Sequence, residues 1–184
     1  MPSLALVIEL PEWLAEHEGE RIEGDEARMR RVLQYAERNV RTGAGGPFAA
    51  GVFDLQDGTL TALGVNVVVP AACSVAHAEM IALARAEQRV GRARLADAGA
   101  FGLYTTAQPC SMCYGALPWA GLSRLVCGAR RTDVEGLTGF DEGPLPATWI
   151  RELQRRGIAV ARDVLRSECC EVLRAYRRNA GKLY

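Results

Sequence analysis

The stretch FGLYTTAQPCSMCYGALPWA, residues 101–120, indicates how the chain folds. Its first seven residues are typical of a β-strand, and residues 111–120 are typical of a short helix that Pro118 distorts near its end. Cys110 and Cys113 fall where the strand gives way to the helix, and their spacing puts them on one face of its first turn. Because strands that alternate with helices build α/β sheets, we expect this class of fold.

The same alternation extends in both directions along the chain. Upstream, Asp57-Gly58 predicts a hairpin between two strands, and Asp25 is the expected N-cap of an amphipathic helix before it. The glycine run at residues 43–46 predicts a plain turn between that helix and the hairpin. Strands separated by helices pair in parallel, so we predict a three-layer α/β/α sandwich with a central mixed five-stranded sheet. The expected helices are 25–42, 74–90, 111–120, 147–156 and 167–179, the expected strands are 48–55, 60–69, 101–107, 124–129 and 158–164, and residues 136–146 are expected to loop.

Length and composition favour one domain. A chain of 184 residues is long enough for one substantial core. Residues 1–24 are interpreted as an N-terminal extension to a domain that spans residues 25–184. The start lacks the basic segment of a signal peptide, and no apolar run approaches the roughly 20 residues of a membrane span. We therefore expect a cytoplasmic protein with no membrane partner, whose six cysteines are reduced.

The charges of the chain balance, with 22 Lys plus Arg against 22 Asp plus Glu. Their distribution is uneven, because residues 9–26 hold eight acids and one arginine, and residues 174–182 carry a basic tail. We interpret both as solvated surface. A neutral chain lacks the positive field that draws proteins onto nucleic acid, so we expect no nucleic-acid partner.

One histidine and two cysteines have the spacing of a metal site. The cysteines lie at a helix start, whose partial positive charge favours thiolate over thiol. One imidazole and two thiolates suit zinc, so we expect one Zn²⁺ per subunit held by His77, Cys110 and Cys113, with water or hydroxide as the fourth ligand. Glu79, two residues beyond the histidine, is placed to carry protons without binding the metal.

This combination of His-x-Glu with Pro-Cys-x-x-Cys is the described pattern of zinc nucleobase deaminases. The chain resembles the cytidine deaminase-like superfamily and, within it, the bacterial guanine deaminases. The likeness runs from about Glu26 to the C-terminus. The segments that carry it are Gly46-Pro47-Phe48-Ala49-Ala50, Gly64-Val65-Asn66, Ala76-His77-Ala78-Glu79, residues 109–116 (PCSMCYGA), Trp119-Ala120 and, pointing to guanine, Gly139-Phe140-Asp141-Glu142-Gly143-Pro144.

The resemblance implies hydrolysis of guanine to xanthine and ammonia, with attack at carbon 2 of the purine. Glu79 would carry a proton to the ring. An acid of the Gly-Phe-Asp-Glu segment would assist departure of the amino group, and we favour Glu142 over Asp141. On residue type alone, both acids would be interpreted as part of a solvated loop.

Further substrate contacts are implied by the same resemblance. Asn66 would hydrogen-bond the purine edge, Phe48 would pack on its face, and Asp141 and Trp119 would lie near the base. Without the resemblance, Asn66 would be interpreted as a turn residue and the two aromatic residues as core. Members of the family form homodimers in which the C-terminal segment can reach the partner's site, so Tyr184 is expected to cap a pocket mouth.

Several alternatives remain open. Gln108 stands where family members often have glutamate, which affects the surroundings of the metal site. The substrate could be guanosine, cytosine or an ammeline-type triazine. A tRNA adenosine deaminase would share the zinc motif and could use the basic tail. A non-enzymatic zinc module, with its metal site closed by Cys73 or Cys127, would leave Glu79 without a role.

Overall fold

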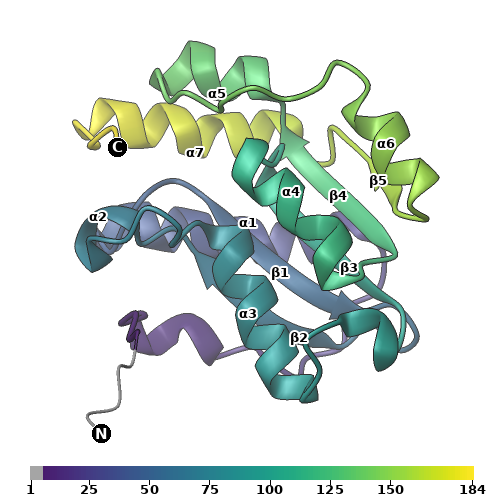
Figure 1. Cartoon of the computed structure of the whole chain (residues 1–184). Helices are drawn as coiled ribbons and strands as arrows, with labels where there is room; N and C mark the ends of the chain where they lie inside the picture. The colour runs from purple at the N-terminus through teal and green to yellow at the C-terminus, as the bar shows by residue number, and fades with distance from the viewer. Residues whose placement is uncertain (1–5) are drawn as a thin grey trace, which may run out of the picture.

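The computed structural model describes residues 6–184, and in it a five-stranded sheet lies between two layers of helices (Figure 1). The strands follow the order β2-β1-β3-β4-β5. β1 pairs antiparallel with β2 and β3, whereas β3, β4 and β5 run parallel. The predicted three-layer sandwich with a mixed sheet is therefore confirmed. The strands are β1 (Ala49–Asp54), β2 (Leu60–Val65), β3 (Phe101–Ala107), β4 (Arg124–Ala129) and β5 (Ala159–Ala161).

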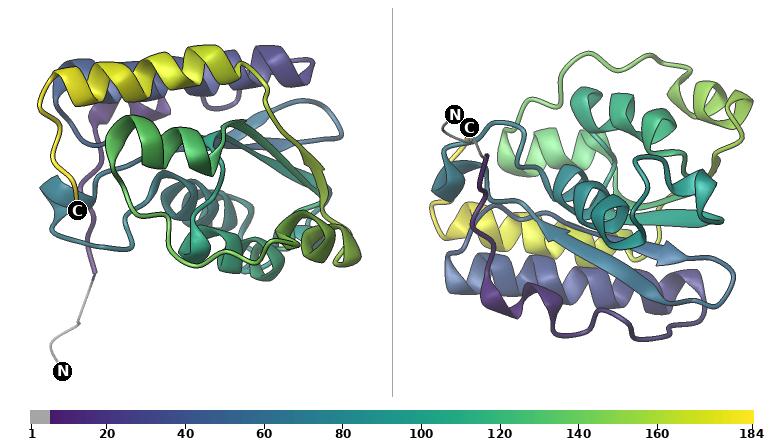
Figure 2. Two further views of the ribbon diagram at one scale, coloured as in Figure 1. Left: turned by 90° about the horizontal axis from the view of Figure 1, so that it is seen from above. Right: turned by 60° about the horizontal axis from the view of Figure 1, so that its bottom comes forward.

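Each face of the sheet is covered by its own helices. α1 and α7 lie side by side over one face, and α5 packs against α7 (Figure 2). α3 and α4 contact each other over the opposite face. The helices are α1 (Asp25–Thr42), α2 (Val68–Ala71), α3 (Ala78–Val90), α4 (Ser111–Ala120), α5 (Arg131–Thr138), α6 (Trp149–Arg155) and α7 (Arg166–Arg178), with 3-10 turns η1 (Glu12–Ala15) and η2 (Leu95–Asp97).

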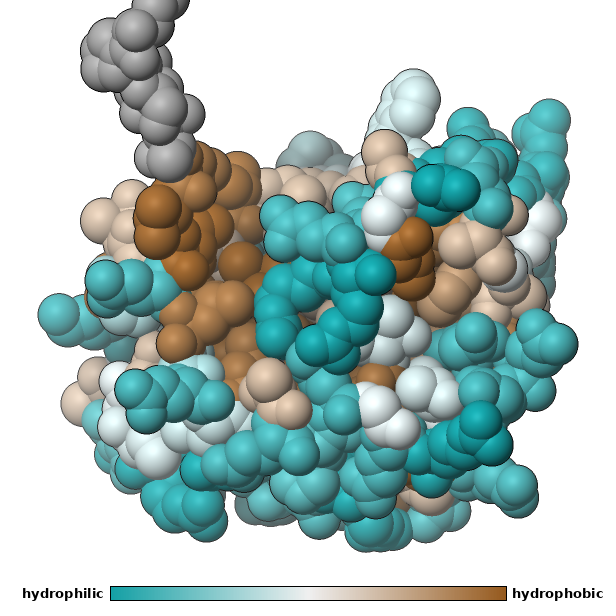
Figure 3. Space-filling view, turned by 90° about the horizontal axis from the view of Figure 1, so that it is seen from below, coloured by the Kyte–Doolittle hydropathy of each residue, from teal (hydrophilic) through white to brown (hydrophobic). Residues whose placement is uncertain are grey.

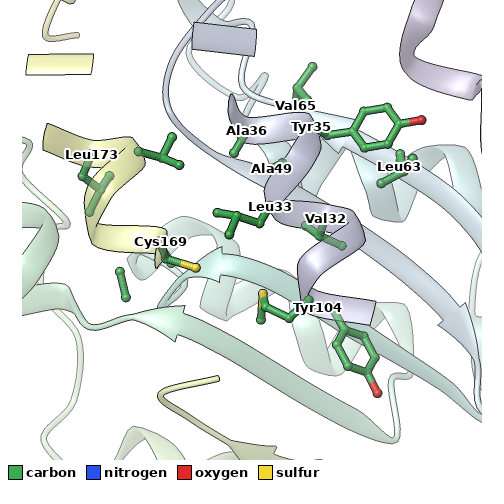
Figure 4. Packing of buried hydrophobic residues seen from close by; sticks show 14 of the residues in the cluster. Val32, Leu33, Tyr35, Ala36, Ala49, Leu63, Val65, Tyr104, Cys169 and Leu173 are labelled. Carbon is green, nitrogen blue, oxygen red and sulfur yellow. The ribbon is translucent and has the colours of Figure 1, made fainter. Parts of the chain in front are cut away.

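The sheet divides the core in two, because successive side chains of a strand point to opposite faces. In β3, Leu103 packs in the layer of α3 and α4, whereas its neighbour Tyr104 packs in the layer of α1 and α7. Figure 4 shows the second layer, in which Val32 and Leu33 of α1 lie in the same cluster as Leu173 of α7. The strand ends that carry the functional residues are thus held between two packed layers.

Local patterns place several elements to the residue. The predicted bounds of α1, β3, α4 and β4 agree with the structure, and Pro118 lies inside the last turn of α4. The hairpin turn is also confirmed, since Gly58 adopts the left-handed backbone with φ of 79° and the Asp57 carboxylate accepts the Thr59 N–H at 2.9 Å.

The predicted continuation of the second strand to residue 69 is wrong, and so is the predicted helix start at residue 74. β2 ends at Val65, and the short helix α2 follows. Ala72 then takes a left-handed conformation with φ of 47°, so the chain turns again before α3 begins at Ala78. The apolar run 67–69 resembled a strand because periodicity cannot separate a short buried helix from a strand. As a result, His77 becomes the N-cap residue of α3.

Two further expectations fail for tertiary reasons. Asp25 does not cap α1: Gly24 occupies the N-cap position, and the Asp25 carboxylate accepts the Tyr104 hydroxyl at 2.7 Å and pairs with Arg124. The stretch predicted to loop begins inside α5, whose buried residues are Val134 and Thr138. Two buried residues, four positions apart, are too few to give a recognisable helical pattern in the sequence.

The N-terminal segment packs against the edge of the sheet. Gly19 N–H donates to Leu60 O at 2.8 Å, and Leu60 N–H donates to Glu20 O at 2.8 Å. The Glu18 carboxylate is 2% exposed, accepts the Leu63 N–H, and pairs with Arg85 and Arg89 of α3. This segment therefore ties edge strand β2 to the helix that carries His77 and Glu79. Residues 1–5 of the predicted extension, where no signal peptide is expected, lie outside the described part of the chain.

The face of the molecule shown in Figure 3 is mostly hydrophilic, with an apolar area next to the first described residues. Leu6 and Val7 there are 81% and 76% exposed. Among residues 6–184, none of the helices combines the length and the apolar character that crossing a bilayer requires.

Candidate functional site

Three potential metal ligands meet where two helices of one layer begin. Cys110 is the N-cap residue of α4, Cys113 lies in its first turn, and His77 is the N-cap residue of α3. Both sulfur atoms lie 3.6 Å from His77 Nδ1, and all three ligand atoms lie within 4.8 Å of one another. The predicted ligands are therefore brought together by the adjacent helix starts.

The spacing of these ligand atoms fits zinc. Zn–S bonds of about 2.3 Å and Zn–N bonds of about 2.0–2.1 Å at a tetrahedral angle place sulfur and nitrogen about 3.6 Å apart. The Sγ···Nδ1 separations match this value. Within the described residues, neither Cys73 nor Cys127 belongs to the cluster. The donor set therefore does not form a closed four-ligand site.

The electrostatic surroundings favour a thiolate at this position. The Cys113 thiol and His77 hydrogen-bond to Cys110 and, against the opposing effect of burial, lower the pKa of the Cys110 thiol to about 4. The same contact with Cys110 raises the pKa of Cys113. A deprotonated sulfur is the form that binds a metal.

Glu79 lies in the first turn of α3, beside the ligands, and is only 6% exposed. Burial raises the pKa of its carboxyl group, and the negative Cys110 sulfur raises it further. A carboxyl group with a raised pKa exchanges its proton near neutral pH more readily than an exposed glutamate does. The position and raised pKa of Glu79 are thus those that a general acid and base requires.

A cavity of about 90 Å³ opens next to the ligands. His77, Glu79 and Cys110 line one side of it, and Asn66 and Phe48 line another. Most of these side chains come from segments far apart in the sequence. The fold therefore brings together residues that were assigned to one site only because the sequence resembles a known family.

The loop after α5 brings its two acids to this cavity in different ways. Asp141 is exposed, and its carboxylate accepts the Gly143 N–H at 2.8 Å, closing a local turn. Glu142 is half-buried, and burial, together with the Cys110 sulfur and Glu79, raises the pKa of its carboxyl group to about 8. Its backbone carbonyl accepts the N–H of Ser111 at 3.0 Å, which holds the loop against the start of α4. Glu142 is therefore protonated near neutral pH.

Asn66 follows the last residue of β2 and is 1% exposed. Its N–H donates to Phe48 O at 3.0 Å, and its Oδ1 accepts the Val68 N–H at 3.4 Å. The side-chain oxygen is therefore held by the protein, which leaves Nδ2 as the group able to donate to a ligand.

The glycine run before β1 is more than a plain turn. The Gly46 N–H donates to Asn66 O at 3.1 Å. A Cβ at Gly46 would lie 2.8 Å from Asn66 Oδ1 and 3.1 Å from the Tyr184 hydroxyl, and a Cβ at Gly45 would overlap Asn66 O. The absence of side chains lets this turn lie directly against Asn66 and Tyr184, two residues that line the cavity. Three glycines in four residues, directly before the Pro-Phe of the motif, were the available signal.

The remaining predicted residues divide into two groups. Tyr184 lines the cavity, with its ring centre 4.8 Å from that of Phe140 and 6.1 Å from that of His77. Gln108 also lines it, and its Oε1 accepts the Arg131 N–H at 3.4 Å. Trp119 lies on the outer side of α4, is 82% exposed, and is not among the cavity-lining residues. A substrate contact by Trp119 stays a prediction.

Asp133 anchors the helix that leads into the Glu142 loop. Its carboxylate accepts the Arg130 N–H at 2.8 Å and two bonds of 2.7 Å from Arg166, which lower its pKa to about 2. This stabilisation is full above the unfolded pKa of about 3.9 and is lost as the pH falls toward 2. We expect Asp133→Asn to lower the free energy of unfolding by roughly 1–3 kcal/mol at pH 7 in urea titrations.

The difference from wild type should shrink between pH 4 and pH 2. Glu135→Gln, which removes the more exposed pair with Arg131, should cost less than about 1 kcal/mol. An Asp133→Asn effect that did not change over this pH range would contradict the assignment of the stabilising charge to Asp133.

Comparisons with known proteins agree with this geometry. A family model described as the cytidine and deoxycytidylate deaminase zinc-binding region matches residues 22–129. The guanine deaminase of Bacillus subtilis (strain 168) is 36% identical over 114 residues, which cover 62% of this chain and 69% of that protein. The tRNA-specific adenosine deaminase of Buchnera aphidicola subsp. Schizaphis graminum is 30% identical over 145 residues, covering 79% of this chain and 86% of that protein.

Solved structures resemble the chain over nearly its whole length. The guanine deaminase from Nitrosomonas europaea superposes with a TM-score of 0.90 at 44% identity, covering 95% of this chain and 97% of that one. The protein NE0047 in complex with 2,6-diaminopurine superposes with a TM-score of 0.92 at 45% identity, covering 98% of this chain and 96% of that one.

Proposed function

Because the chain belongs to the cytidine and deoxycytidylate deaminase zinc-binding family, we propose that it is a guanine deaminase, which hydrolyses guanine to xanthine and ammonia. The observation that carries this proposal is the arrangement of Glu79, Glu142 and Asn66 around one cavity beside a His-Cys-Cys cluster. Its likeness to guanine deaminases over nearly the whole fold supports guanine as the base.

His77 Nδ1 and the sulfur atoms of Cys110 and Cys113 would hold one zinc ion per chain, with water as the fourth ligand. When bound, zinc supplies the acidity that makes water a nucleophile near pH 7. The protein supplies the remaining requirements, which are proton transfer and orientation of the base.

Glu79 takes a proton from the attacking water and gives one to the purine ring, which would otherwise accumulate negative charge during attack at carbon 2. The bond between carbon 2 and the amino nitrogen then breaks, and that nitrogen must leave as ammonia. Glu142 donates a proton to it, since its raised pKa of about 8 keeps it protonated at neutral pH. The proton of the remaining carbon-2 hydroxyl leaves as the carbonyl of xanthine forms and returns to Glu142. One water is therefore consumed, one ammonia is released, and both carboxyl groups regain their starting forms.

Asn66 and Phe48 orient the base. The Asn66 Nδ2 group donates to an acceptor on the purine edge, because its Oδ1 is already engaged with Val68. Phe48 lines the cavity with its ring centre 5.5 Å from that of Phe140, offering an aromatic wall for a flat ring. A base with the wrong edge would leave Asn66 without a partner in a buried site.

The proposed activity is tested by ammonia release from the zinc-loaded protein, screened over guanine, guanosine, cytosine, adenine and ammeline. We expect guanine to give a kcat/KM at least about tenfold above each of the others, the ratio that 1.4 kcal/mol of discrimination produces. A higher value for another base would assign the enzyme to that substrate instead.

A tRNA adenosine deaminase is the second candidate, favoured by the identity with the Buchnera protein. Phosphate contacts make RNA affinity fall steeply with salt, whereas guanine turnover should change little. The balanced charge of the chain argues against this activity. Inosine formation in tRNA, with binding that weakens by orders of magnitude between 50 and 200 mM salt, would support it over guanine deamination.

A homodimer is also proposed. Trp119, exposed on α4, and Leu6 and Val7 offer apolar surface to a second copy. Tyr184 lines the cavity of its own chain, and exchange of the C-terminal segment between copies stays a prediction. Light scattering should give the dimer mass, and a monomer at all concentrations would contradict the proposal.

The C-terminal segment should act on substrate binding. It contributes Tyr184 to the lining of the cavity of about 90 Å³. The centre of the Tyr184 ring lies 4.8 Å from that of Phe140 and 6.1 Å from that of His77. We expect removal of residues 181–184 to raise the Michaelis constant for guanine by about tenfold or to abolish turnover, since the lost aromatic contacts are each worth about 0.5–1.5 kcal/mol.

Lys182→Ala is the matched control for this truncation. It changes an exposed side chain of the same segment and keeps the backbone carbonyl that accepts the Tyr176 hydroxyl at 2.7 Å. Its kinetics should match wild type. A truncated enzyme with unchanged kinetics would show that the segment does not contribute to the site.

A further inference from the structure

Asn39 is a polar residue in an apolar position. It lies on the face of α1 that buries Tyr35 and Ala36 and is 0% exposed. Its Oδ1 has no hydrogen-bond partner among the described residues. Burying an unpaired amide oxygen is unfavourable, so packing alone would place an apolar side chain here. Packing of the core therefore does not explain why an asparagine stands at position 39.

The reason lies in the two hydrogen bonds of its amide nitrogen. Asn39 Nδ2 donates to Gly46 O at 2.8 Å and to Asn66 O at 2.9 Å. Both acceptors are carbonyl oxygens, so the opposite orientation of the amide would set its oxygen against two others. The orientation of the amide, and with it the unpaired Oδ1, is thus imposed by these two contacts.

These bonds join three segments at the residue proposed to bind the purine. The Asn66 carbonyl accepts from Asn39 Nδ2 and from the Gly46 N–H, while the Asn66 N–H is fixed by Phe48 O. The hypothetical Cβ of Gly45 lies 3.0 Å from Asn39 Nδ2, so the turn passes directly over the amide. Both the N–H and the carbonyl of the Asn66 backbone are consequently fixed by hydrogen bonds.

We propose that Asn39 is a positioning residue for substrate recognition: through the Asn66 carbonyl it holds the Asn66 side chain in the orientation that meets the purine edge. The inference rests on the proposed function, because it assigns Asn66 to a base with a hydrogen-bond acceptor. Asn39 itself lies behind the cavity wall and is not among the lining residues.

A double-mutant cycle tests this role. Asn39→Leu keeps a similar size but removes both donors, and Asn66→Ala removes the side chain that Asn39 is inferred to position. We expect Asn39→Leu to lower kcat/KM for guanine by about 10- to 100-fold, mainly through a higher KM, as small misplacements at a site do. In the Asn66→Ala background the same change should have almost no further effect, because the two residues act as a unit.

Asn39→Asp and Val32→Ala complete the set. Asn39→Asp keeps the shape but turns an acceptor toward two carbonyls, so it should lose as much kcat/KM as Asn39→Leu. Val32→Ala also removes packing from the buried face of α1, but at the position where the helix lies against Gly51 of β1. It should lower the melting temperature with little change in KM. Independent, multiplicative losses for Asn39→Leu and Asn66→Ala would overturn the proposal.

Amide hydrogen exchange gives a readout that needs no substrate. In Asn39→Leu the Gly46 amide, bonded to Asn66 O, should exchange at least about tenfold faster, the factor that a 1.4 kcal/mol weaker local structure produces. Thr105 in the central strand β3 reports global opening and should exchange as in wild type. Unchanged exchange at Gly46 would overturn the inference even if guanine is turned over. Absence of guanine turnover in wild type would instead refute the proposed function and leave the exchange result to decide the role of Asn39.

Discussion

Replacing Glu79 by alanine should abolish ammonia release while leaving the fold and the bound zinc in place. Glu79 is the buried carboxyl group beside the ligand cluster, and it is proposed to move the proton from water to the ring. General acid–base catalysis contributes about 10²–10⁴-fold to such reactions, so we expect kcat to fall by at least this factor. Steady-state ammonia assays, with zinc content from atomic absorption, measure both quantities.

Two variants separate proton transfer from structure. Glu79→Gln keeps the size and polarity of the side chain but cannot transfer a proton, so it should be as inactive as Glu79→Ala. Glu87→Ala removes a half-buried carboxyl group from the same helix away from the cavity and should keep wild-type activity. Neither Glu79 variant should melt at a much lower temperature, since the change relieves a buried acid. Full activity in Glu79→Ala would refute the mechanism.

The second large effect is expected at Glu142. Glu142→Gln should lower kcat by about 10²–10³-fold, within the range for loss of one general acid, while retaining zinc. KM for guanine should change less, because the amide still fits the space and can still form a hydrogen bond. Asp141→Asn is the matched control in the same loop. Its side chain can still accept the Gly143 N–H, so its activity should stay near that of wild type.

The pH profile gives a separate test of Glu142. Burial, with the Cys110 sulfur and Glu79, raises its pKa to about 8. The acid is needed in its protonated form, which is populated below that pH and lost above it. Wild-type kcat should therefore decline above about pH 8, and the weak residual activity of Glu142→Gln should lack this decline. A decline shared by both enzymes would assign it to another group.

Local sequence was sufficient for elements whose pattern matches their burial. β3 and α4 agree with prediction to the residue, because a continuous apolar strand and a helix that follows it directly are both properties of neighbouring residues. The prediction failed where tertiary contacts replace local ones. Asp25 pairs with Tyr104 and Arg124 instead of capping its helix, and α5 packs against α7 through only a few buried residues.

Parts of the candidate site likewise could not be predicted from the sequence. The glycine run at residues 43–46 looks like a connection, since nothing nearby in the sequence shows that Asn66 lies against it. Asn39 belongs to an otherwise ordinary amphipathic helix, and its role depends on two carbonyls from other segments. Its contact with Asn66 spans 27 residues, and such a separation leaves no periodic pattern in a single sequence.

The sequence by itself determined the metal chemistry. His77, Glu79, Cys110 and Cys113 lie at two helix starts, where the spacing along a helical turn dictates which side chains share a face. The tertiary structure alone decided which distant groups join them. It brought Asn66, Glu142 and Tyr184 to the cavity and separated Asp141 from Glu142 by burial. Burial and neighbouring charge set the pKa of a carboxyl group, and both are properties of the folded chain that residue order does not contain.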